Sequence, residues 1–217
     1  MDLNEVMLCA PTTRRFLPDP VDPGALRRVL DNARFAPSGG NRQGWRVIAV
    51  TDAGTRETLA DLYLPHWRAY MDQTGAAEML ARPQQHDEAR VRMLRRADEF
   101  AERLGEVPLH LVICVRLGDL AIVDRGLDRP SIVGGASVYP FVQNVLLGLR
   151  NEGLGASLTT LLAPAEPQVR RLLAIPDDVV LAAYVLAGSR ADPWPKRLSR
   201  KAVAEFAFSE RYGEPLA

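Results

Sequence analysis

A recurrence of apolar residues every three to four positions predicts the longer helices of the chain. Residues 23–36 carry such a stripe, with Asp22 as a cap and Pro23 as the first helical residue. A stronger stripe covers residues 138–149, where neighbouring faces are also apolar. This helix is expected to be central, buried nearly all round and ended by Gly153. Shorter helices are predicted at residues 53–63 and 167–173.

Continuous apolar runs predict the buried strands. They cover residues 45–50, 109–116 and 179–188, and residues 156–162 are expected as a short strand or an extended loop. The sequence contains no internal repeat, low-complexity tract or clear linker. We therefore predict a single α+β domain over residues 1–217.

Residues 64–107 differ from the rest of the chain because they are rich in charge. Arginines alternate with carboxylates between Arg90 and Glu102, which is typical of a solvated helical face, although a basic binding site has a similar composition. We predict one or two surface helices here, inserted into the domain as a helical lid.

The charge balance argues against partners that are held by bulk charge. The 217 residues include 27 Lys+Arg and 27 Asp+Glu, so the formal net charge is zero. We therefore expect neither nucleic acid nor an anionic membrane as a partner. The N-terminal stretch does not resemble a signal peptide, and no apolar run reaches the ~18 residues that span a bilayer, so a cytoplasmic location is expected.

Cysteine and histidine are too few and too scattered to indicate a metal site. Cys9 and Cys114 are the only cysteines, and Cys114 lies in an apolar run where a buried, inert thiol is expected. The spacing of His66, His86 and His110 makes no metal-binding set, and we expect each of them on the surface or in the lid.

Three arginine-bearing polar segments lie at the boundaries of the predicted elements. They are TTRRF at residues 12–16, APSGGNRQGW at residues 36–45 and KRLSRK at residues 196–201. Each alone is compatible with a surface pair, a turn or a solvated tail. Together they suit one phosphorylated ligand, because arginine binds phosphate through paired, charge-assisted hydrogen bonds. The GxGxxG, P-loop, HExxH and GxSxG patterns do not occur.

Three ordered stretches resemble the FMN-dependent nitroreductase family, over about residues 6–213. LRRVLDNARFAPSGGNRQGWRVIAVTD is similar to the family's helix, APS-x-x-N-x-Q-x-W loop and first core strand. YPFVQNVLLGLRNEGLGASLTTL and VRRLLAIPDDVVLAAYVLAG are similar to its central helix and to the segment before its tail. The resemblance implies a mixed central sheet of four to five strands wrapped by helices, in a domain-swapped homodimer whose tail, residues 189–217, reaches the partner subunit.

The resemblance also implies two identical FMN sites between the subunits. Arg14 would contact the flavin, and the turn at Thr159 and Thr160 would present N–H groups to flavin N5 and O4. Residues 38–43 would come from the partner chain, and Arg200, with Lys201 or Arg197, would hold the phosphate. The implied cofactor-binding set is Thr12, Thr13, Arg14, Arg15, Pro37, Ser38, Gly39, Gly40, Asn41, Gln43, Thr159, Thr160, Arg197, Arg200 and Lys201.

Some positions depart from the family's pattern. Ala10 and Pro11 stand where one or two basic residues are usual, which weakens phosphate binding unless Arg15 or Arg197 compensates. Thr160 stands where glycine is common, which narrows access to the flavin face.

The implied activity is that of an NAD(P)H-dependent FMN oxidoreductase. NAD(P)H passes hydride to flavin N5, leaves, and is replaced by a flat acceptor such as a nitroaromatic or a quinone, in a ping-pong mechanism. Because the flavin carries the chemistry, no catalytic side chain is expected. Trp67 and Tyr70, in the lid, are the expected substrate residues.

Two alternatives stay open. One is a specialised flavoenzyme of the same family: an oxidase, a dehalogenase or a flavin-cleaving enzyme. The flavin-cleaving branch is disfavoured, because it resembles R-R-D-x-R where this chain has Pro11, Thr12 and Thr13. The other is a flavin-binding or storage protein without turnover.

Overall fold

A four-stranded sheet organises the chain, which this computed structural model describes over residues 1–216. In spatial order the strands are β1 (Trp45–Val50), β2 (Leu109–Arg116), β4 (Val179–Ser189) and β3 (Leu154–Thr159). All neighbouring strands are antiparallel. The α+β prediction with four strands is confirmed. Within residues 1–216, however, parallel pairing is limited to the isolated bridge between Thr12 and Ala156, because β2 and β3, which run in the same direction, are separated by β4.

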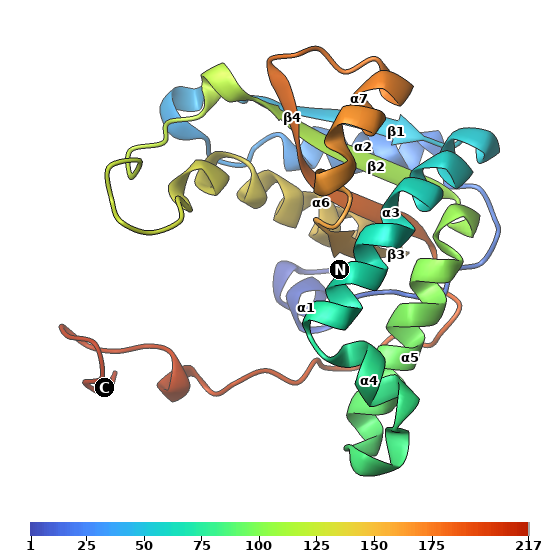
Figure 1. The fold of residues 1–217 in the computed structure, drawn as a ribbon. Coiled ribbons are helices and arrows are strands. Elements are labelled where there is room, and N and C mark those ends of the chain that lie inside the picture. The colour runs from blue at the N-terminus through green and yellow to red at the C-terminus, as the bar shows by residue number, and fades with distance from the viewer. Residues whose placement is uncertain (217) are drawn as a thin grey trace.

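Helices cover both faces of this sheet (Figure 1). One face is covered by α2 (Pro23–Ala33) and α6 (Tyr139–Asn151). The other face is covered by α3 (Ala53–Gln73), α5 (Glu88–Glu102) and α7 (Glu166–Leu173). The short helices α1 (Leu3–Leu8) and α4 (Ala76–Ala81) add to these layers.

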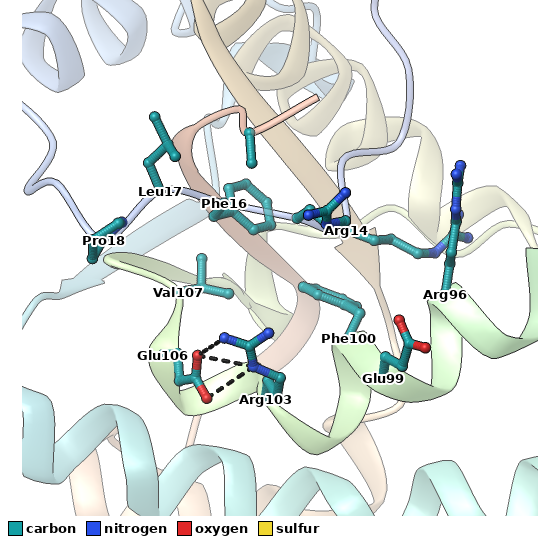
Figure 2. A pocket seen from close by; sticks show the side chains of 12 residues that line it. Arg14, Phe16, Leu17, Pro18, Arg96, Glu99, Phe100, Arg103, Glu106 and Val107 are labelled. Atoms are coloured by element: carbon teal, nitrogen blue, oxygen red, sulfur yellow. Dashed lines mark hydrogen bonds and ion pairs between the residues drawn. The ribbon is translucent and has the colours of Figure 1, made fainter. Parts of the chain in front are cut away.

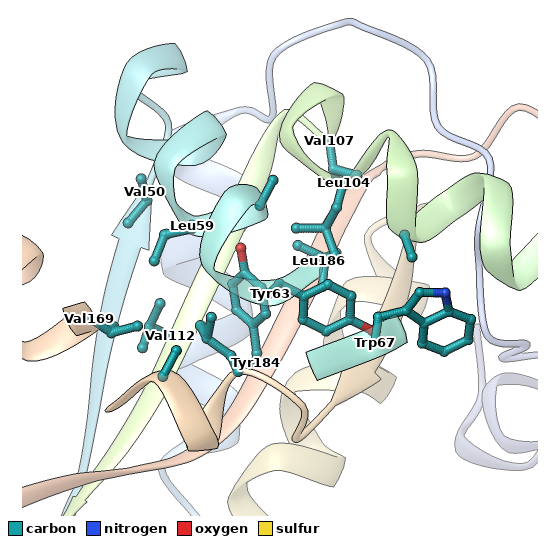
Figure 3. Close-up of a cluster of buried hydrophobic side chains, with 14 of the residues drawn as sticks. Val50, Leu59, Tyr63, Trp67, Leu104, Val107, Val112, Val169, Tyr184 and Leu186 are labelled. Carbon is teal, nitrogen blue, oxygen red and sulfur yellow. The ribbon is translucent and has the colours of Figure 1, made fainter. Parts of the chain in front are cut away.

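The side chains of β2 alternate between the two cores. Leu111 and Ile113 face α2 and α6, whereas Val112 and Cys114 face α3, α5 and α7. Successive side chains of a strand point to opposite faces, so a strand covered on both sides is apolar throughout. This explains the continuous apolar run in the sequence. The predicted burial of Cys114 is also confirmed, and this burial raises the pKa of its thiol to about 11. Figure 3 shows the core on the α3 side, with Tyr184 among its larger side chains.

Local signals set the ends of the helices. Asp22 accepts hydrogen bonds from two N–H groups in the first turn of α2, which confirms the predicted cap. The helix ends at Ala33 and not at Ala36, because the last residues before Pro37 turn back on themselves with short-range hydrogen bonds. Gly153 follows α6 with a φ of 78°, the left-handed conformation predicted for it.

The charged segment at residues 64–107 contributes to the core. Helix α3 continues through Pro65 to Gln73, because Trp67 and Met71, one turn apart, are buried in the core that α5 also covers. The indole N–H of Trp67 donates to Asp98 at 2.8 Å. The predicted helices are therefore present, but the expectation that they are only surface elements is wrong for their inner face. The charged residues lie on the outer face of these helices, and their number makes the apolar stripe of the inner face hard to recognise in the sequence.

His110 is fully buried inside β2, so its predicted place on the surface or in the lid is wrong. Its Nε2 lies 3.1 Å from the Leu104 carbonyl oxygen, and its Nδ1 lies 2.5 Å from the Tyr184 hydroxyl. A carbonyl can only accept, so Nε2 carries the proton and Nδ1 accepts from Tyr184. Burial lowers the pKa of His110 to about 4 and keeps the ring neutral at pH 7.

This burial predicts a pH dependence of stability. The folded-state pKa of His110 lies below the ordinary value of 6.5, so the unfolded chain takes up this proton first as the pH falls. The neutral His110 ring therefore contributes about 3 kcal/mol to the free energy of unfolding. This contribution is complete above about pH 6.5 and is lost as the pH falls to about 4. Urea unfolding across this range should show a shallower decline of the unfolding free energy for His110→Gln than for the parent. His86→Gln, at an exposed histidine, should retain the parent slope. Identical slopes for all three proteins would contradict the assignment.

Candidate functional site

Residues 12–16 lie along the end of the sheet and carry the first predicted arginine pair. Thr12 bridges Ala156, and the Thr13 N–H donates to the Ala156 carbonyl oxygen at 2.8 Å. The Thr13 side chain is fully buried over Gly155, where an added Cβ would stand 2.6 Å from Thr13 Oγ1. Only glycine leaves this space, so Gly155 sets the position of Arg14, the next residue.

Arg14 is a partly buried cation. Burial lowers the pKa of Arg14, an effect that Tyr63 opposes, but the guanidinium stays charged at neutral pH. Within residues 1–216 no carboxylate forms an ion pair with it. Arg15 differs, because it is exposed and pairs with Asp192 at 3.0 Å. An unpaired, partly desolvated guanidinium favours an electron-rich or anionic ligand.

Two adjoining cavities, of about 400 and 220 Å³, lie between residues 12–18 and α5; we call them the α5 groove. Both are lined by Arg14, Arg15 and Arg96. Figure 2 shows the larger cavity, with apolar side chains such as Val107 at one end and Arg14 and Arg96 toward the other.

A further cavity of about 440 Å³ lies beside α6; we call it the α6 cavity. It joins two predicted residues, Thr12 and Arg200, and it also touches Arg150. The Arg150 guanidinium stacks 3.8 Å from the Trp194 ring and donates to the Cys9 carbonyl oxygen at 3.2 Å. Sequence reasoning did not identify Arg150 or Trp194. The sequence feature that could have indicated Arg150 is its place as a basic residue in the last turn of the predicted central helix.

The turn after β3 adjoins Arg14 through one tyrosine. Burial raises the pKa of Tyr63, and interactions with Thr159 and then Arg14 oppose the rise. The turn and the arginine therefore flank the same side chain. Thr159 Oγ1 accepts the Leu161 N–H at 3.2 Å, which holds the turn. Thr160 follows directly.

The loop at residues 37–43 is held in an unusual conformation. Gly40, Asn41 and Gln43 have φ values of 60°, 53° and 51°, a left-handed region in which the two non-glycine residues are strained. Hydrogen bonds maintain this shape: Ser38 Oγ accepts the Gln43 N–H at 3.0 Å, and Asn41 Oδ1 accepts from the Gln43 amide at 3.0 Å. Strain that is held in this way marks a candidate binding loop.

One chain does not bring this loop to the arginines. The Gly39 N–H donates to Ser137 Oγ at 3.0 Å, and the loop lies by that residue. In the described part of the chain, residues 37–43 line neither the α5 groove nor the α6 cavity. The predicted cofactor residues thus form two separate groups in one chain.

The tail leaves the body of the molecule after a few contacts (Figure 1). The Leu198 N–H donates to the Leu8 carbonyl oxygen at 2.9 Å. Beyond it, Arg200 and Lys201 are exposed, as are large apolar side chains such as Phe206 and Tyr212.

The two predicted substrate residues have different surroundings. Trp67 is buried in the core, where it packs and hydrogen-bonds Asp98. Tyr70 is about half exposed at 45% and lies next to it, with ring centroids 6.0 Å apart. Neither residue lines the α5 groove or the α6 cavity within residues 1–216. Their substrate role stays a prediction.

Among residues 1–216, no three side chains of His, Cys, Asp or Glu are grouped as metal ligands are. No helix in the same range has both the length and the apolar character needed to cross a membrane.

The comparison with protein families decides the relationship. The model of the nitroreductase family matches residues 11–188, most of the chain. The chain belongs to the nitroreductase family. The match includes residues 12–16, the loop at 37–43 and the turn after β3, and it ends before the tail.

Relatives of this nitroreductase-family chain have different named activities. The 5,6-dimethylbenzimidazole synthase of Rhodospirillum rubrum is 27% identical over 191 residues, which cover 84% of this chain and 77% of that protein. The nitrobenzene nitroreductase of Ectopseudomonas oleovorans is 24% identical, with coverage of 89% and 90%. Sequence similarity therefore supports the family without separating these reactions.

Solved structures confirm the fold. An iodotyrosine deiodinase bound to FMN and 3-iodo-L-tyrosine superposes with a TM-score of 0.71 at 20% identity, over 96% of this chain and all of the other. The NADPH:FMN oxidoreductase of Vibrio harveyi in complex with NAD⁺ gives 0.67 at 18% identity, over 97% and 78%. The predicted nitroreductase-like fold is thus correct.

The contact between Thr13 and Gly155 can be tested by adding one methyl group. Gly155→Ala should destabilise the protein by about 1–3 kcal/mol, because the new Cβ overlaps Thr13 and must displace residues 12–16. Gly118→Ala is the matched control, since nothing lies within 4 Å of its Cβ position, and should change stability by less than about 0.5 kcal/mol. Thermal unfolding measures both. Equal melting temperatures for the two variants would remove the proposed constraint.

Proposed function

We propose that this chain is an FMN-dependent oxidoreductase that uses NAD(P)H to reduce nitroaromatic, quinone or related flat acceptors. The observation that carries the proposal is Arg14: a partly desolvated cation without an ion-pair partner in residues 1–216, positioned beside the turn after β3 in a nitroreductase-family chain. The groups around it suit the polar edge of a flavin.

The residues present fit FMN in both charge and space. The α6 cavity, at about 440 Å³, holds the hydroxyl of Thr12 and two guanidinium groups, those of Arg150 and Arg200. A phosphate is an acceptor of such bonds. Ala10 and Pro11, which stand where the family usually has basic residues, line this cavity too. Arg150 supplies positive charge in the same cavity.

Each group has a defined task in this proposal. When bound, FMN supplies hydride transfer between NAD(P)H and the acceptor. Arg14 binds the pyrimidine edge and favours negative charge there, and the backbone of Thr159 and Thr160 directs N–H groups toward N5 and O4. Thr12, Arg150 and Arg200 orient the phosphate. No side chain is required to act as an acid or a base.

The second half of the site comes from a partner subunit in this proposal. The loop at residues 37–43 has a strained, hydrogen-bonded conformation, but within residues 1–216 it lines neither the α5 groove nor the α6 cavity. A homodimer would bring the loop of one protomer to the arginines of the other. The extended tail, with exposed Val203, Phe206 and Tyr212, suits a position across the partner.

A flavin-cleaving reaction is the second candidate. The sequence disfavours it at Pro11, Thr12 and Thr13, yet the relatives include 5,6-dimethylbenzimidazole synthases at 27–28% identity. Titration with NAD(P)H, first without and then with oxygen, separates the two functions. A reductase bleaches and recovers its flavin absorbance, whereas a cleaving enzyme loses the flavin permanently.

The first test of the proposal is cofactor affinity. The purified protein should bind one FMN per chain, and Arg200→Ala should weaken FMN binding roughly ten- to a hundredfold through loss of a charge-assisted phosphate contact. Riboflavin, which has no phosphate, should lose far less affinity. Arg171→Ala, at an exposed arginine on α7, should leave both ligands unaffected. Equal losses for FMN and riboflavin would show that Arg200 does not contact the phosphate.

The second test asks whether one site draws on two subunits. Arg14→Ala and Asn41→Ala homodimers should each bind FMN weakly. A mixed dimer, purified by two different affinity tags, should regain about half of its sites at parent affinity, because one site then combines an intact Arg14 with an intact Asn41 from opposite chains. Flavin titration counts the tight sites. A mixed dimer without any tight site would place both residues in the same subunit and overturn the shared site.

A further inference from the structure

We propose that the α5 groove binds an aromatic ligand that carries an anionic group, a phosphate or a carboxylate. Its ring would lie over the apolar end of the groove and its anion would bind Arg96, because Arg14 is assigned to the flavin in the proposed function. The proposal rests on the proposed function, because it names the kind of donor or acceptor that reaches this flavoenzyme, but the binding itself is measurable without turnover.

Charge is the first argument. The smaller cavity of the groove is lined by five arginines and by one carboxylate, that of Asp192. The chain as a whole has no net charge, so this surplus is local. Arginines drawn from three separate segments, residues 12–16, α5 and the end of β4, converge on one cavity.

The pairing of these arginines is the second argument. Asp192 is engaged by Arg15, and Arg92 pairs with Glu88 at 2.6 Å, one turn earlier on α5. Within residues 1–216, Arg14 and Arg96 form no ion pair. Arg190 lines the same cavity as Arg96. Burial lowers the pKa of Arg190; Asp192 opposes this effect, and the charge of Arg96 adds to it. A bound anion would relieve this repulsion.

The shape of the larger cavity is the third argument. Phe16 and Phe100 pack with ring centroids 6.1 Å apart, and Val107 extends the apolar surface (Figure 2). Arg103 is neutralised there by Glu106, with which it forms a bidentate pair. Glu99 also lines this cavity, beside Arg96, so six arginines and three carboxylates line the groove as a whole. An apolar surface at one end and an excess of arginine at the other match a ring with an attached anion.

Two sources supply this chemistry: a nucleotide phosphate of the hydride donor, or a carboxylate on the acceptor. Calorimetry on the FMN-loaded protein with adenosine 2′,5′-bisphosphate and with 4-nitrobenzoate distinguishes them. Uncharged adenosine and nitrobenzene are the matched ligands. At least one anionic probe should bind on the order of tenfold more tightly than its uncharged partner.

Arg96→Ala should weaken that probe on the order of tenfold, and Arg96→Lys should restore part of the loss. Arg95→Ala is the control, since it removes the same charge from an exposed, adjacent position of α5 that lines neither cavity. In turnover, the KM of the matching substrate should rise while kcat and flavin content stay at the parent values. A nucleotide source raises the KM for NADPH, and a carboxylate source raises the KM for 4-nitrobenzoate.

Indistinguishable binding by Arg96→Ala and Arg95→Ala, or equal affinity for charged and uncharged probes, would overturn the proposal. Failure of the proposed function has a different signature. A protein that takes up no FMN fails that test whether or not the groove binds the probes, because calorimetry reports the groove directly.

Discussion

Thr13 fills the space over Gly155, and from this contact the placement of the cationic groups follows. The hydrogen bond from Thr13 to Ala156 and the bridge at Thr12 attach the N-terminal segment to β3. Arg14 follows directly and lines the α5 groove, whereas Thr12 lines both this groove and the α6 cavity. A side chain at residue 155 would displace this segment, and with it both residues.

Residues 12–16 therefore separate two binding spaces of different character. The α6 cavity joins Thr12 with Arg150 and Arg200, whereas the α5 groove combines aromatic rings with an excess of arginine. In the function we propose, the first space holds the phosphate of FMN and the second receives the ligand that exchanges electrons with it. A neutral chain achieves this by concentrating charge locally, since anion affinity depends on a few placed groups and not on net charge.

The fold does not choose among the reactions of its relatives. A synthase, a nitroreductase and a deiodinase share this architecture with the chain. The sheet and its two helical layers provide a common base on which sites of different chemistry are built. Hydrogen bonds within the loop at residues 37–43 maintain its left-handed conformation.

The sequence by itself determined the strands, the capped helix α2, the central helix ended by Gly153 and the family, because these depend on local periodicity, caps and ordered motifs. It also located Arg14, Thr12 and Arg200. Only the tertiary structure placed His110 in the core and packed the inner face of the charged segment at residues 64–107 against that core. It also brought Arg150 to the α6 cavity and Arg96 to the α5 groove. These outcomes depend on which face of an element is covered and on contacts between residues that are 31 positions apart for Trp67 and Asp98, 74 for His110 and Tyr184 and 141 for Arg150 and Cys9. Neither is encoded in local spacing.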